Sequence, residues 1–139
     1  MGLDQYAYVA ARENQRADFF EQDGIEFDAT GEWVVPEGGI QKPREIAYWR
    51  KHPNLQGWME KLWRSKGGTG EFNCEEVELT FQDLDNLMDA IKGSNLPQTK
   101  GFFFGSDKDY YYLRNDLNFV QEAKTAIADG YQVFYLSWW

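Results

Sequence analysis

The densest group of side chains able to do chemistry lies in the segment YWRKHPNLQGW, residues 48–58. Two cationic side chains and the chain's only histidine directly precede a helix that is predicted to begin at Pro53. Free N–H groups at a helix N-terminus attract anions, and histidine titrates near neutral pH. The segment therefore predicts either an anion or phosphate site or a solvated basic turn anchored by buried tryptophans. Its candidate ligand-binding residues are Tyr48, Trp49, Arg50, Lys51 and His52.

A second candidate is Asp116, in the helix predicted over residues 109–129. At 100° per residue it falls inside an apolar arc, so most of YYYLRNDL, residues 110–117, is expected in or near the core. A buried carboxylate is costly unless it is paired or hydrogen-bonded. Asp116 is therefore either a satisfied structural ion pair or a ligand-facing acid with a shifted pKa. The arc consists of Leu113, Leu117, Val120, Ala123 and Ile127, widened by Tyr112 and Phe119.

The remaining motifs predict no metal, no cofactor and no catalytic residue. One histidine and one cysteine cannot supply a usual zinc site. Asp107 and Asp109 are expected to favour the N-terminus of the third helix rather than to bind a cation. The glycines of SKGGTGE, residues 65–71, follow a helix instead of opening one, so the segment is read as a flexible connection and not a phosphate loop.

The periodicity predicts an α+β fold, with a mostly antiparallel central sheet and about three helices packed on it. The chain is expected to form a single globular domain over residues 1–139, with an irregular segment at about 13–43 that contains a small hairpin across Thr30-Gly31. Helices are expected from Pro53 to about Ser65, after a Thr80 cap as far as Gly93, and over 109–129. Strands are expected at 3–12, 75–80, 101–105 (GFFFG) and 131–139, the last one central in the sheet, whereas 44–51 is either a strand or a helix entry.

Composition and charge narrow the class of protein. The single cysteine, Cys74, the lack of a long apolar run and the lack of a signal peptide predict a cytoplasmic protein with no membrane partner. A net charge of −9 argues against nucleic acid as a partner, although residues 42–66 carry seven basic and two acidic residues. Two terminal tryptophans, Trp138 and Trp139, favour a homodimer, since exposed tryptophan pairs lower solubility.

Three blocks resemble a family of small phage and bacterial proteins of unknown function. They are MGLDQYAY at the start, EIAYWRKHPNLQGWM, and LPQTKGFFFGSDKDYYYLRNDL. Members of that family are sometimes labelled phosphoglycerate kinase, but such a kinase needs two large domains and a nucleotide site, for which this chain has no room. The resemblance implies a phage-type or environmental origin and adds no catalytic residue. Its motifs fall on Tyr48, Trp49, Arg50, Lys51 and Trp58, and on the residues from Phe102 to Ser106.

Three functions follow from these observations. We favour a non-enzymatic binding or accessory protein that acts through a protein partner, since aromatic residues and arginine are typical of interface cores. The alternative is a protein or enzyme that grips a small anion or phosphate compound with Arg50, Lys51, His52 and Asp116. The second alternative is nucleic-acid binding through the basic segment 42–66.

Overall fold

The computed structural model describes residues 2–11, 23–24, 26–27, 33–34, 43–101 and 103–139. The main feature of this part of the chain is a five-stranded sheet. Its strands lie in the order β2-β5-β1-β7-β6. All neighbours are antiparallel except β2 and β5, which run parallel. The strands are β1 (Asp4–Ala10), β2 (Asp23–Gly24), β5 (Arg44–Arg50), β6 (Glu76–Leu79) and β7 (Gln132–Trp138).

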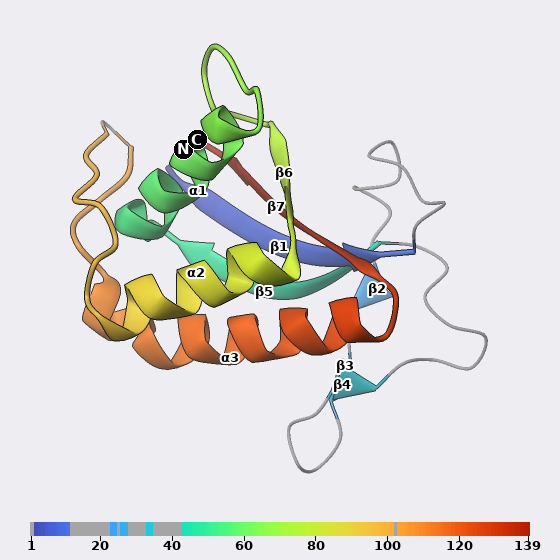
Figure 1. The fold of residues 1–139 in the computed structure, drawn as a ribbon. Helices are drawn as coiled ribbons and strands as arrows, with labels where there is room; N and C mark the ends of the chain where they lie inside the picture. Colours follow the sequence, from blue (N-terminus) through green and yellow to red (C-terminus); the bar gives the residue numbers. More distant parts are fainter. Residues whose placement is uncertain (1, 12–22, 25, 28–32, 35–42, 102) are drawn as a thin grey trace.

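Three helices cover one face of this sheet. They are α1 (Pro53–Ser65), α2 (Phe81–Lys92) and α3 (Asp109–Ala128). Figure 1 shows α2 and α3 side by side across the strands. Leu55 of α1, Leu84 of α2 and Val120 of α3 join Val9 and Tyr135 of the sheet in one buried cluster. The predicted α+β fold with a mostly antiparallel sheet is confirmed, and β7 lies inside the sheet as expected.

The helix ends follow from local chemistry. The Thr80 hydroxyl accepts a hydrogen bond from the Asp83 N–H, and the Asp83 carboxylate accepts one from the Thr80 N–H. This reciprocal capping box satisfies two donors that the first turn of α2 would otherwise leave free. At the far end of α3, Gly130 adopts φ +92° and its N–H donates to the Ile127 carbonyl. A glycine accepts this left-handed conformation without strain, so the helix stops there.

The segment 44–51, which the sequence left open, contains a strand with a bulge. In the β1–β5 register Ala7 pairs with Ala47 and Tyr8 pairs with Glu45, so Ile46 is the extra residue. Ile46 and Ala47 consequently both pack against the helix-side core. The bulge sets the orientation of the residues that follow it, because it fixes which of them face the helices.

The opposite face of the sheet carries a second, smaller aromatic cluster. Tyr8 and Leu136 are buried there, with Tyr6, Phe134 and Trp138 packed against them. The rings of Tyr6 and Trp138 lie 4.7 Å apart between centroids. Trp138 is therefore partly buried against the sheet.

Two expectations about the aromatic segment were wrong. The stretch 101–105 forms no strand in its described residues, because Phe104 N–H donates to the Gly101 carbonyl in a turn and Gly105 adopts φ +79°. Most of YYYLRNDL is not core either, since Tyr110 is 92% and Tyr111 is 75% exposed. The buried side of α3 carries Tyr112 and Asp116 together with apolar residues such as Phe119 and Val120.

The predicted hairpin across Thr30-Gly31 agrees with the pairing of two short strands. β3 (Glu26–Phe27) pairs antiparallel with β4 (Trp33–Val34). The turn itself, and most of the segment 13–43, lie outside the described residues. In the described part of the chain, no helix combines the length and the apolar character that crossing a membrane requires.

Replacing Thr80 with alanine tests the cap of α2. The Thr80→Ala variant loses the hydroxyl that accepts from Asp83, so we expect the free energy of unfolding to fall by about 1 kcal/mol. Urea denaturation measures this loss. Thr69→Ala, at an exposed position in the loop after α1, is the matched control and should change stability by less than about 0.5 kcal/mol. Equal effects of the two substitutions would show that the cap contributes nothing.

Candidate functional site

Asp116 of α3 forms the centre of a buried polar cluster. Its Oδ1 accepts a hydrogen bond from Trp49 Nε1 at 2.9 Å, and its Oδ2 lies 2.9 Å from His52 Nε2. Trp49 and His52 are fully buried, and Asp116 is 1% exposed. The carboxylate thus joins the end of β5, the residue before α1 and the middle of α3.

The hydrogen bonds assign the proton on His52. An ionised carboxylate only accepts, so Nε2 must carry the proton that it donates to Asp116. In the neutral ring, Nδ1 then carries a lone pair and accepts. This Nδ1 is buried without a hydrogen-bond partner, and the carboxylate oxygen Oδ1 of Asp109 lies 3.9 Å away. That separation is too long for a hydrogen bond, so Nδ1 stays without a hydrogen-bond partner beside Asp109.

The backbone around His52 is held by side chains from other elements. Gln5 of β1 accepts from the His52 N–H at 2.8 Å and donates to its carbonyl at 3.0 Å. The Tyr112 hydroxyl accepts from the Arg50 N–H at 2.9 Å and lies 3.1 Å from the Arg50 carbonyl. Between them Lys51 adopts φ +55°, an uncommon conformation for a residue with a side chain. These bonds keep the turn from β5 into α1 in place.

A second layer of polar contacts positions Asp109. Asn54 of α1 donates to Asp109 Oδ1 at 3.1 Å and accepts from the Thr99 N–H at 3.0 Å. Thr99 can approach so closely because α1 carries Gly57, where a Cβ would lie 1.8 Å from the Thr99 hydroxyl. Asp107 completes the layer by accepting from the Asp109 N–H at 2.8 Å. The loop before α3 is thereby fixed to the start of α1.

A pocket of about 300 Å³ opens beside this layer. Among its lining residues three are aspartates and none is basic. Burial raises the pKa of Asp109, and the neighbouring charges of Asp107 and Asp116 add to the rise. The backbone N–H of Asp109 lowers the pKa of Asp107. The lining residues are Ile91, Ser94, Leu96, Asp107, Asp109, Tyr110, Leu113 and Asp116.

The structure brings together three of the six candidate residues, namely Trp49, His52 and Asp116. Tyr48 and Arg50 instead share Asp4, to which Tyr48 donates at 2.6 Å and Arg50 at 2.7 Å. The Tyr48 ring packs against Tyr6, away from the helices. Lys51 is half-buried at the turn. A Cβ added to Gly105 would lie 3.1 Å from the Lys51 Cβ, so the Lys51 side chain runs along that glycine.

Some basic side chains of the segment 42–66 are paired with acidic side chains. Arg64 pairs with Glu60 at 2.7 Å, on the exposed side of α1. Lys66 pairs at 2.6 Å with Asp83, which comes from the acidic stretch that follows in the sequence. The two oppositely charged stretches therefore neutralise each other in part, and Lys42 lies outside the described residues.

Several polar residues of the site gave little signal in the sequence. Gln5 lies on the buried face of β1, between Leu3 and Ala7 at a spacing of two. A polar residue at such a position could have been recognised by the same reasoning that singled out Asp116. Asn54 and Thr99 gave no comparable signal, because each acts through a contact between distant segments.

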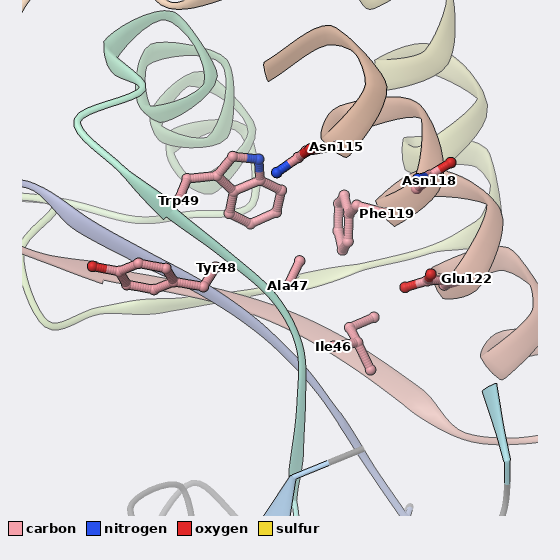
Figure 2. A pocket seen from close by; sticks show the side chains of 8 residues that line it. All are labelled: Ile46, Ala47, Tyr48, Trp49, Asn115, Asn118, Phe119 and Glu122. Carbon is pink, nitrogen blue, oxygen red and sulfur yellow. The ribbon is translucent and has the colours of Figure 1, made fainter. Parts of the chain in front are cut away.

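A smaller pocket of about 170 Å³ lies between β5 and α3. Figure 2 shows Ile46, Ala47 and Trp49 on the strand facing Phe119 and Glu122 on the helix, while the Tyr48 ring extends the other way. Burial raises the pKa of Glu122 to about 7. This carboxyl group therefore titrates near neutral pH in the folded protein.

No protein-family model, curated protein or solved structure matches this chain. Within the described ranges, histidine, cysteine and acidic side chains form no group of three or more that could hold a metal ion. The candidate site is therefore defined by its own geometry alone.

Removing the central carboxylate should destabilise the fold strongly. Asp116→Ala leaves the buried N–H groups of Trp49 and His52 without an acceptor, so we expect a loss of about 3 kcal/mol or more in the free energy of unfolding. Urea denaturation measures it. Asp129→Ala, at the exposed end of α3, should change stability by less than about 0.5 kcal/mol. A loss at Asp116 as small as that of the control would contradict a structural role for the cluster.

Glu122 should make stability depend on pH. The pKa of Glu122 is about 7 in the folded protein and 4.5 ordinarily, so protonation of Glu122 stabilises the folded state relative to the unfolded chain, with the full effect present below pH 4.5. This contribution is lost as the pH rises through 7. We expect Glu122→Gln to be more stable than the wild type at pH 8, by on the order of 1 kcal/mol after allowance for partial exposure, and nearly equal at pH 4. Urea denaturation at both pH values tests this, with exposed Glu71→Gln as the control; parallel pH curves for wild type and Glu122→Gln would contradict it.

Proposed function

We propose that this chain is a non-enzymatic binding protein that holds a segment of a protein partner at the start of α3. The binding surface consists of Tyr110, Tyr111 and Leu113 together with the 300 Å³ pocket beside them, and we call it the tyrosine surface. The observation that carries the proposal is the exposure of Tyr110 and Tyr111, at 92% and 75%. Two neighbouring aromatic side chains left in water beside a concave pocket are typical of a binding interface.

The tyrosine surface rests on a rigid support. Tyr111 packs edge-on against Tyr112, with 4.8 Å between ring centroids, and Tyr112 stacks on His52 at 5.1 Å. Tyr112 is in turn held by the backbone of Arg50. A partner would meet a Tyr111 ring that is already positioned, which reduces the entropy lost on binding.

The buried cluster supports binding more than catalysis. Both oxygens of Asp116 are engaged by donors, and the rings of Trp49 and His52 are fully buried. A catalytic acid or base must reach a proton on its substrate within hydrogen-bond distance. Such burial favours a role in fixing α3, on which the tyrosine surface lies.

The two alternatives have less support from the geometry. An anion next to Asp116 would also meet Asp107 and Asp109 in the same pocket, and like charges repel. For nucleic acid, Arg64 and Lys66 already have acidic partners. The expected phage-type origin, cytoplasmic location and homodimer stay part of the proposal, in which the chain is an accessory factor that docks on a host protein.

Selection from a displayed library of random peptides tests the proposal. We expect immobilised wild-type protein to enrich a family of related peptides, because a preformed aromatic surface binds selected sequences in preference to random ones. The Tyr110→Ser/Tyr111→Ser variant should lose at least about tenfold in affinity for them, since two exposed rings together contribute about 1.4 kcal/mol or more. Titration of synthetic peptides by calorimetry gives the affinities.

Matched controls come from an exposed aromatic residue elsewhere. Phe81→Ser replaces a 46% exposed ring on α2 and should leave the affinities within about twofold. Failure to enrich any peptide family, or equal binding by the Tyr110→Ser/Tyr111→Ser variant, would overturn the proposed function. Melting temperatures of all variants establish that each is folded.

A further inference from the structure

The geometry points to an arginine or lysine side chain of the partner as the occupant of the 300 Å³ pocket beside the tyrosines. This inference rests on the proposed function and names the chemistry of its partner. The pocket is lined by Asp107, Asp109 and Asp116, with no basic residue among the lining side chains. A cationic head group is therefore the charge complement of its polar wall.

The carboxylates that line the pocket are hydrogen-bond acceptors, which favours a ligand rich in donors. His52 Nδ1 is buried, without a hydrogen-bond partner, and faces Asp109 at 3.9 Å. When the ring is neutral, Nε2 donates to Asp116 and Nδ1 accepts. A donor placed against Asp109 could bond to both groups. Guanidinium, with five N–H donors, and ammonium, with three, suit such a site, whereas a neutral or anionic head group does not.

The basic group beside the Asp109 carboxylate in the free protein is the His52 ring, whose Nδ1 lies 3.9 Å from Oδ1. Asp109 Oδ1 accepts a hydrogen bond from the neutral amide of Asn54, and His52 Nδ1 is too far away for a hydrogen bond. Burial and, to a smaller extent, the charges of Asp107 and Asp116 raise the pKa of Asp109, and this rise outweighs the lowering by the Asn54 hydrogen bond and the His52 ring. A bound cation would remove this unfavourable charge accumulation, so binding and charge neutralisation act in the same direction.

The rest of the pocket suits the alkyl stem of a basic residue. Ile91 and Leu96 are buried at its wall, and Leu113 lines it while 39% exposed. Lysine and arginine pack their methylene groups on apolar surface and keep the charged end among polar groups. Tyr110 also lines the pocket, and its ring can attract a cation through its π face. The apolar wall of the pocket thus suits the alkyl stem of a basic residue, and its carboxylates and Tyr110 suit the charged head group.

Titration with a capped arginine tests the inference without knowledge of the partner. The probe is N-acetyl-arginine methylamide, added to the ¹⁵N-labelled full chain at low salt and followed by amide chemical shifts. We expect saturable shifts at Asp109, Tyr110 and Leu113, and about tenfold weaker binding of the neutral isostere N-acetyl-citrulline methylamide, as for loss of a charged hydrogen bond. Asp109→Asn should weaken the arginine probe about tenfold, and Asp129→Asn, with the same charge change at the other end of α3, less than twofold.

Several outcomes would overturn the inference. They are equal binding of citrulline, equal effects of Asp109→Asn and Asp129→Asn, or shifts that map away from the pocket. Saturation of the same amides by Mg²⁺ or Ca²⁺ with no response to the arginine probe would assign the acceptors to a metal ion instead. If displayed peptides bind through Tyr110 and Tyr111 but carry no basic residue, this inference fails while the proposed function stands. If the arginine probe binds but no peptide family is enriched, the proposed function fails and the pocket is a small-cation site.

Discussion

The carboxylate of Asp116 is the group on which the arrangement of this protein depends. Its two oxygens bond to the Trp49 indole of β5 and to the His52 imidazole before α1. A charge this deeply buried would be very unfavourable if either donor were missing. The rotation of α3 that satisfies both donors also directs Tyr110 and Tyr111 into solvent. The same arrangement of α3 therefore accompanies both the buried hydrogen bonds of Asp116 and the exposure of the two tyrosines.

A chain of hydrogen bonds extends this arrangement across the core. Gln5 donates to the Tyr135 hydroxyl at 2.9 Å, and Tyr135 donates to Gln56 at 2.6 Å. Because Gln5 also holds the backbone of His52, β1, β7 and α1 meet in one network. Burial raises the pKa of the Tyr135 hydroxyl, which stays a donor at every physiological pH. Networks of this kind favour one packing arrangement over others, since any shift leaves buried polar groups unpaired.

The sequence predicted the elements better than it predicted their faces. Pro53, Thr80 and Gly130 mark helix ends through local chemistry, so all three helices were expected close to where they lie. The apolar arc of α3 placed Leu113 in the core, but it is 39% exposed. The buried face of α3 also carries Asp116 and Tyr112, whose hydrogen bonds connect segments far apart in the sequence. Local periodicity contains no information about such partners, although it did identify Asp116 as a residue that required one.

The two strands at the middle of the sheet come from opposite ends of the described chain. Asp4 of β1 pairs with Trp138 of β7, and Figure 1 shows these strands running side by side. The pairing of β1 with β7 thus cannot form before β7 has been synthesised, even if the helices have already formed. Closing so long a loop costs entropy before any contact compensates for it. During synthesis, the apolar faces of α1 and α2 are made before the core residues of α3 and β7 that pack with them, and a chaperone would matter most in that interval.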